Sequence, residues 1–345
     1  MKHKILTAAL MLALFLNLYT GEAFAAKPIP PPPPPPSDFP NQNGLNYASA
    51  YWHLDPALTT DEILHRDFRL FQDSKISLIC LNVHWSYLEP SMGNYRVSYL
   101  DDVIRVCNIA NQYGISVVID FHTLMGNNSY TIPTWVSSRA FNTVMHNSTV
   151  RQAWLNMLSF SAGYLNSVPN IHSWHMMNEP YIGSWAVQCS VDDFIQLWSD
   201  MKTAIRQHSI LPVTVRLAAN SVLRDFENDP RMYELFDYIT LTWYETYYPI
   251  RDFENLVNMI KGYGKDVTVA EWGYKTNKDP QQYSKFVTYL NLFKGLEIKW
   301  TLAWIWRSDS ASVDVPETIG KGWNICKNAN GDPRQSFYAI AAANN

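Results

Sequence analysis

The chain has 345 residues, of which 47% are hydrophobic, 17% are charged and 14% are aromatic. This composition supports one large core and is too polar for a chain that crosses a membrane repeatedly. The formal net charge of −4 and the scattered Lys and Arg residues argue against nucleic acid as a partner.

The N-terminal region has the features of an exported protein. Residues 1–25 combine a basic start, an apolar segment at 5–18 and a small-residue cleavage site that ends at Ala25, which together predict a secretion signal. The apolar segment is short for a transmembrane helix, so we expect cleavage and a location outside the cytoplasm or in the cell envelope. Residues 26–40 contain seven consecutive prolines and predict an extended polyproline II linker.

The four cysteines lie far apart and form no CxxC pair, so we expect no metal site. They are Cys80, Cys107, Cys189 and Cys326. In an exported protein they could form no disulfide, one or two, and their spacing does not choose among these.

Residues 41–345 alternate between short apolar runs and helical segments, a pattern typical of a parallel sheet with crossover helices. The expected strands are residues 44–47, 77–83, 116–121, 172–177, 212–217, 238–242, 267–270 and 300–304. Helices with recognisable ends are expected at 99–113, 191–207 and 280–293. Eight alternations predict a single closed (β/α)8 barrel, a TIM barrel, rather than an open doubly wound sheet.

Two of the expected strands run into a glutamate. Glu179 follows the fourth strand and precedes Pro180, which cannot continue a strand, and Glu271 ends the seventh. Burying an ionised glutamate costs several kcal/mol unless the charge is paired or used. Since active sites of such barrels lie at the C-terminal ends of the strands, both carboxyls should face one mouth. A pair of carboxyls is the minimum needed to cleave a glycosidic bond, one as proton donor and one as nucleophile or base.

The order of the motifs resembles that of the retaining glycoside hydrolases of clan A, in particular family 5, which contains cellulases and mannanases. The resemblance extends over residues 41–345. It is carried by Asn178-Glu179-Pro180, Glu271-Trp272-Gly273, Asp120-Phe121-His122, Tyr244, Trp304-Ile305-Trp306, and the segment from Trp85 to Pro90 with Gly93, Tyr95 and Leu100-Asp101. Each motif lies at an expected strand end, so the set is far more specific than Asn-Glu-Pro alone.

The resemblance implies the roles of the two glutamates. Glu179 would be the acid/base and would need a raised pKa, and Glu271 would be the nucleophile. In a retaining enzyme the two carboxyls lie about 5–5.5 Å apart and the reaction passes through a covalent glycosyl-enzyme. This chemistry requires no metal and no organic cofactor.

The resemblance also implies substrate contacts. Asn178 would bond the sugar 2-hydroxyl, His122 another sugar hydroxyl, and Tyr244 would donate its hydroxyl to the nucleophile. Trp306, and with less support Trp304, would form the stacking floor under the cleaved sugar. For each of these except Asn178, plain core packing is the alternative.

Three positions leave alternatives open. Family members usually carry an arginine on strand 2 that supports the nucleophile, and here that place falls on Cys80. They also carry a histidine two residues before the strand-6 tyrosine, where this chain has Thr242. Trp85 is expected to be either a sugar platform or a core residue.

We therefore expect a secreted, monomeric retaining β-glycosidase that hydrolyses a β-linked polysaccharide or oligosaccharide, of the endo-β-glucanase or β-mannanase type. An exo-acting β-glycosidase of another clan A family is the first alternative. A catalytically inactive carbohydrate-binding barrel is the second, because the arginine on strand 2 is missing.

Overall fold

The computed structural model describes residues 42–47, 59–121, 131–136, 146–180, 189–220, 229–307, 323–326 and 331–345. The predicted signal and the proline-rich linker lie outside the described residues. In the described part, none of the helices combines the length and the apolar character that a membrane span needs. All four cysteines are described, and each carries a free thiol.

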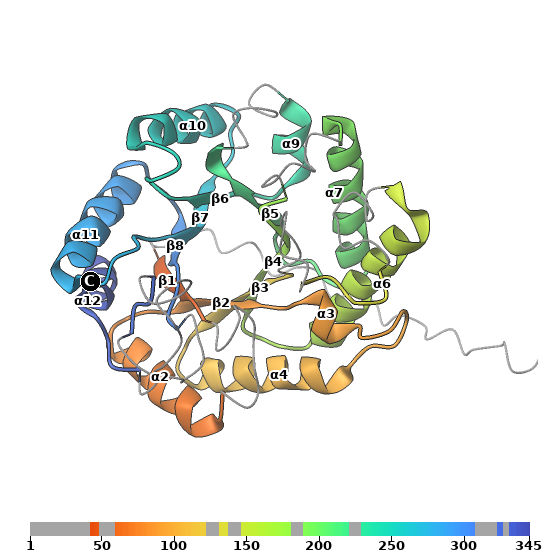
Figure 1. Cartoon of the computed structure of the whole chain (residues 1–345), viewed down its shortest axis with the longest axis horizontal. Coiled ribbons are helices and arrows are strands. Elements are labelled where there is room, and N and C mark those ends of the chain that lie inside the picture. Colours follow the sequence, from red (N-terminus) through yellow and green to blue (C-terminus); the bar gives the residue numbers. More distant parts are fainter. Residues whose placement is uncertain are drawn as a thin grey trace, which may run out of the picture. The chain divides into compact units, whose positions relative to one another are not determined.

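Eight parallel strands form a closed barrel in the order β1 to β8 (Figure 1). They are β1 (Gln42–Asn46), β2 (Leu78–Asn82), β3 (Ser116–Asp120), β4 (Ile171–Asn178), β5 (Val213–Ala218), β6 (Ile239–Trp243), β7 (Val267–Trp272) and β8 (Trp300–Ala303). Pairing of β1 with β8, from Gln42 opposite Trp300 to Leu45 opposite Ala303, closes the ring. The predicted (β/α)8 barrel is therefore confirmed, and each expected strand overlaps an observed one.

Helices surround the barrel (Figure 1). Those described are α2 (Asp61–Asp73), α3 (Trp85–Leu88), α4 (Val97–Gln112), α6 (Ser148–Leu165), α7 (Val191–Arg206), α9 (Pro230–Leu235), α10 (Ile250–Gly262), α11 (Asp279–Gly295) and α12 (Gln335–Ala343). The three predicted helices correspond to α4, α7 and α11. Ser190 caps α7 in a capping box with Asp193. Gly114, just after α4, has a φ of +68°, which glycine adopts without strain.

Alternate residues of each strand face the helices or the barrel interior. Val117 and Ile119 of β3 belong to the large core between the strands and the helices, whereas Val118 belongs to a separate cluster. That cluster consists of Leu78, Cys80, Val118, Tyr238, Ala270, Trp300 and Leu302. It fills the barrel interior, so the barrel is a packed core rather than a pore.

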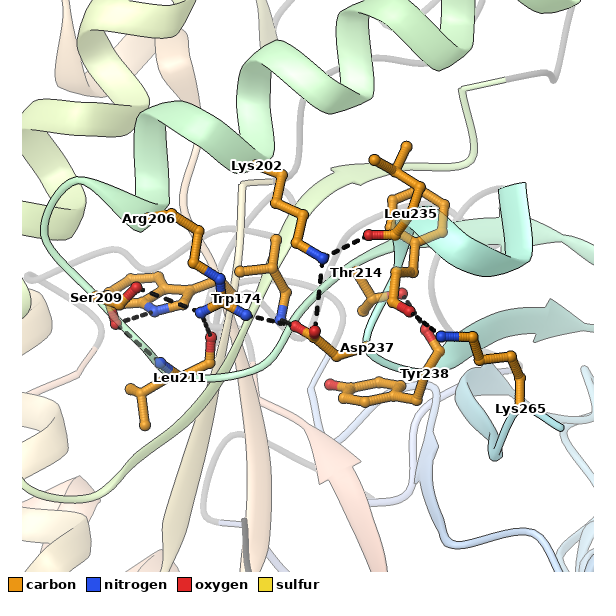
Figure 2. Close-up of polar contacts among 12 residues, drawn as sticks. Trp174, Lys202, Arg206, Ser209, Leu211, Thr214, Leu235, Asp237, Tyr238 and Lys265 are labelled. Atoms are coloured by element: carbon orange, nitrogen blue, oxygen red, sulfur yellow. Dashed lines mark hydrogen bonds and ion pairs between the residues drawn. The ribbon is translucent and has the colours of Figure 1, made fainter. Parts of the chain in front are cut away.

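Asp237 organises the N-terminal ends of β5 and β6 (Figure 2). Its carboxylate accepts a hydrogen bond from the backbone N–H of Val213 (2.7 Å) and pairs with Arg206 (2.6 Å) and Lys202 (3.5 Å). Arg206 also donates to the carbonyl of Leu211 (2.5 Å) in the loop before β5. This network lies at the end of the barrel opposite to the strand ends that carry the two glutamates.

Candidate active site

Both glutamates lie at the C-terminal ends of their strands. Glu179 follows β4 directly and is 9% exposed, and Glu271 is the fifth residue of β7 and is 7% exposed. Strands between them connect the two positions: the N–H of Glu179 donates to the carbonyl of Arg216 on β5 (2.7 Å), and Thr242 of β6 lies opposite Glu271. The two carboxyls therefore lie at one end of the barrel and are almost completely removed from water.

The backbone of Glu179 is strained. Its φ is +43°, a region that residues with a Cβ rarely adopt, and Pro180 follows it directly. Strain of this kind costs about 1–3 kcal/mol and is concentrated at functional sites, where the surrounding structure imposes it. The conformation is thus an observation, independent of any motif, that makes Glu179 a candidate functional residue.

The environment of Glu179 favours its neutral form. Burial raises the pKa of Glu179 well above 4.5, and the negative charge of Glu271 raises it further. Arg216 and Thr242 act in the opposite direction without reversing the shift. A carboxyl that stays protonated where ordinary glutamates are ionised can donate a proton to a leaving group.

Two side chains hold the carboxylate of Glu271. The hydroxyl of Tyr244 donates to Oε1 (2.8 Å), and the guanidinium of Arg216 donates to Oε2 (3.1 Å). Each oxygen thus has a donor, and one of the donors is a cation. The side chain is held in one orientation, with a positive charge beside it.

Arg216 is the residue that the sequence analysis missed. It lies on β5, is completely buried, and its second terminal nitrogen contacts Asn46 Oδ1 (3.2 Å), Cys80 Sγ (3.1 Å) and Asp120 Oδ2 (3.3 Å). The fifth strand was predicted from its apolar pattern, and no motif singled out its arginine. A charged residue inside a buried parallel strand was the available signal, because such a charge must have a partner.

The prediction for Trp306 is wrong. Trp306 is fully buried, packs edge-on against Phe71 of α2 (4.9 Å), and donates its indole N–H to the buried Asp67 (3.1 Å). No face of its ring is open to a sugar. Trp304 is 7% exposed and packs with Tyr244, which binds Glu271, so of the two tryptophans Trp304 lies at the site.

Of the two alternatives left open for Trp85, a sugar platform or a core residue, the structure supports the core residue. It is fully buried, donates its indole N–H to Glu89 (2.5 Å), and packs edge-on against Trp135 (5.5 Å) and Trp154 (5.0 Å). The contact with Trp154 places the ring against α6. Asn178, by contrast, is the last residue of β4 and pairs in register with Arg216.

His122 lies outside the described residues, so its predicted contact stays a prediction. In the described part of the chain, no group of three or more His, Cys, Asp and Glu side chains is arranged to hold a metal ion. The described part of the site therefore consists of two carboxyls, the guanidinium of Arg216, the phenol of Tyr244 and the ring of Trp304 beside it.

A comparison with protein-family models gives a match over most of the chain. The family model for cellulase (glycosyl hydrolase family 5) matches residues 41–310. A search of curated protein sequences found no significant match.

Solved structures share the fold at low sequence identity. An exo-β-1,4-mannosidase from Opitutaceae bacterium strain TAV5 is 14% identical, with a TM-score of 0.73 over 88% of this chain and 59% of that protein. The chain thus spans less than two thirds of that mannosidase. A GH5_18 protein from Streptomyces cattleya in complex with Manβ1-4GlcNAc is 13% identical, with a TM-score of 0.71 over 88% of this chain and 80% of the other. An endogalactoceramidase is 17% identical, with a TM-score of 0.63 over 88% of this chain and 79% of the other.

Proposed function

The chain belongs to glycoside hydrolase family 5, a family of retaining glycoside hydrolases, and we propose that it cleaves a β-linked glycan with Glu179 as acid/base and Glu271 as nucleophile. The observation that carries this proposal is the contrast between the two carboxyls at one end of the barrel. Glu179 has a raised pKa, whereas Glu271 is held by a cation and a phenol. This is the division of labour that a double displacement needs.

In the first step Glu271 attacks the anomeric carbon while Glu179 gives its proton to the departing glycosidic oxygen. In the second step Glu179 takes a proton from water, the water oxygen bonds to the same carbon, and the Glu271 carboxylate leaves. The charge of Glu271 is one of the causes that raise the pKa of Glu179. Forming the ester removes that charge, so the pKa of Glu179 falls when it has to act as a base.

Other residues of the mouth bind the sugar in this proposal. Asn178 bonds the 2-hydroxyl, and His122 contacts another hydroxyl, as the family resemblance implies. Trp304 provides the stacking surface, since it packs with Tyr244 and Trp323 in a small cluster apart from the main core. Tyr244 stacks edge-on with Trp323 (4.8 Å), which extends the aromatic wall beside the nucleophile.

We propose β-mannosides and β-glucans as the substrate class, acted on by an exported, monomeric enzyme. Mannosides come first because similar solved structures are described as an exo-β-1,4-mannosidase and as a complex with Manβ1-4GlcNAc. The N-terminal sequence supports export. Arg216 supplies a guanidinium at the nucleophile, which removes the reason for regarding the barrel as inactive.

The test is nucleophile rescue on aryl β-glycosides. Glu271→Ala should abolish turnover, and azide should restore it by forming the α-glycosyl azide. Glu179→Ala should slow substrates with poor leaving groups far more than activated aryl glycosides. Glu245→Ala is the matched control, because Glu245 is bound by Lys285 and Tyr289 (2.6 Å each) and should need no azide. A β-glycosyl azide, or no product, would contradict the assignment of Glu271.

A further inference from the structure

The side chain of Arg216 crosses the interior of the barrel. Its Cα lies on β5, whereas its guanidinium contacts Asn46 on β1, Cys80 on β2, Asp120 on β3 and Glu271 on β7. In a closed ring of eight strands, β1 lies four strands from β5 in either direction. The charged end therefore lies far from its own strand, beside the strands on the opposite side.

Cys80 leaves the space into which this guanidinium fits. Its Sγ lies 3.1 Å from the Arg216 terminal nitrogen, and its thiol donates to Asn82 (3.6 Å). Burial raises the pKa of the Cys80 thiol to about 12, so the thiol is neutral and does not compete with the carboxylates for the cation. A longer side chain at position 80 would occupy the volume that the guanidinium fills.

Asp120 holds the terminal nitrogen of the guanidinium that does not contact Glu271. It is completely buried and pairs with Arg216 Nη2 (3.3 Å), while Nη1 of the same guanidinium donates to Glu271 (3.1 Å). The rigid planar fork links the two contacts, so the position of one nitrogen determines that of the other. Asp120 and Asn46 thus anchor one terminal nitrogen of the guanidinium, and the other terminal nitrogen holds Glu271.

We propose that Arg216 is the positioning residue for the nucleophile Glu271, and that it does from β5 what an arginine on β2 does in relatives, in the space vacated by Cys80. This inference deepens the proposed function and rests on it. It implies that positions 80 and 216 are coupled: the site accommodates one guanidinium, and either strand can supply it.

The coupling is tested with three variants of the full chain, assayed on the aryl β-glycoside that the wild type turns over best. Arg216→Ser should lower kcat by about 100-fold or more while KM changes little, because it leaves a buried carboxylate without its cation. Cys80→Arg should also be impaired, since two guanidinium groups compete for one buried space. The double variant Cys80→Arg/Arg216→Ser should exceed both single variants in kcat by at least about tenfold.

The pH dependence of kcat/KM distinguishes a positioning role of Arg216 from a general disturbance of the fold. The groups that act on Glu179 are Glu271 on β7, Arg216 on β5, Thr242 on β6 and Asp120 on β3. Because Arg216 opposes the rise in the pKa of Glu179, the alkaline limb of kcat/KM should move to higher pH in Arg216→Ser. Arg216→Lys keeps the positive charge but loses the planar guanidinium. Its alkaline limb of kcat/KM should therefore stay at the wild-type pH, while its kcat should be reduced.

Arg206→Met is the matched control, because Arg206 pairs with Asp237 at the far end of the barrel (Figure 2). It should lower Tm without moving kcat or the alkaline limb. If Arg216→Ser keeps kcat within about threefold of an active wild type, or if the folded double variant is no better than the single ones, the inference is overturned and the proposed function stands. Should Arg216→Ser fail to fold, an unaltered kcat in Arg216→Lys would overturn the inference equally. A wild type that turns over no glycoside would remove the proposed function itself.

Discussion

Tyr244→Phe isolates one contact of Glu271, the proposed nucleophile. The substitution removes a single oxygen, the donor to Glu271 Oε1 (2.8 Å), and keeps the ring that packs against Trp323 (4.8 Å). Arg216 still holds Oε2 (3.1 Å), so the carboxylate keeps its cation and loses only one of its two orienting groups. The expected result is therefore a partial loss of activity.

The size of the loss follows from the type of bond. A hydrogen bond to a charged group contributes about 1.5–3 kcal/mol, and 1.4 kcal/mol corresponds to a factor of ten. We therefore expect kcat/KM to fall by about 10-fold to 150-fold. Because Tyr244 acts on the nucleophile and not on the acid, the loss should be similar for good and poor leaving groups whenever formation of the glycosyl-enzyme limits the rate.

The assay measures kcat/KM at 25 °C on two aryl β-glycosides whose phenols differ in pKa, together with a thermal melt of each protein. Tyr247→Phe serves as the control, since Tyr247 follows closely in the sequence, is 70% exposed and loses the same oxygen. Its kcat/KM should stay within about twofold of wild type. A loss below about threefold for Tyr244→Phe, or one confined to poor leaving groups, would refute the role assigned to the hydroxyl.

Two further predictions concern stability. Asp67→Ala leaves Arg307 buried without its carboxylate partner and removes the hydrogen-bond acceptor of Trp306. We therefore expect the free energy of unfolding to fall by about 3–5 kcal/mol and Tm to fall by about 5–15 °C. An unchanged Tm would contradict the structural role given to Trp306. Because the pKa of Glu179 is raised in the folded state, its contribution to stability is complete below about pH 4.5 and is lost as the pH rises through the folded pKa. The free energy of unfolding of the wild type, measured by urea titration relative to Glu179→Gln, should therefore decline above pH 4.5, and a difference that stays flat to pH 8 would count against the raised pKa.

The fold and the two glutamates could be predicted because local pattern and global topology agree. Each strand is a short apolar run between helical segments, and a closed parallel ring covered by helices buries eight such runs on both faces. Glu179 and Glu271 end two of those runs, so the rule that strand ends form the mouth was sufficient to place them at one end of the barrel. No contact between distant residues had to be known.

The aromatic residues could not be assigned in the same way. Trp304 and Trp306 were both expected to form the stacking floor, but β8 ends at Ala303, so the alternation of side chains along a strand determines the direction of neither. Trp306 instead turns toward α2, where Asp67 accepts its indole N–H. For Trp85 the sequence left a sugar platform and a core residue as alternatives, and in the short helix α3 its side chain is buried in the core. Where the chain leaves regular structure, the sequence pattern no longer determines where a ring points.

Arg216 shows a different reason why sequence motifs are incomplete. A motif assigns a chemical group to a strand, whereas the interior of a barrel is organised in layers to which several strands contribute. Within one layer a long side chain can reach a neighbour of the opposite strand, as the contacts of Arg216 with Asn46 and Cys80 show. On the proposed mechanism the group needed is a cation at Glu271 Oε2, and in this chain β5 provides it. A missing motif residue therefore argues for inactivity only after every inward-facing residue of the same layer has been considered.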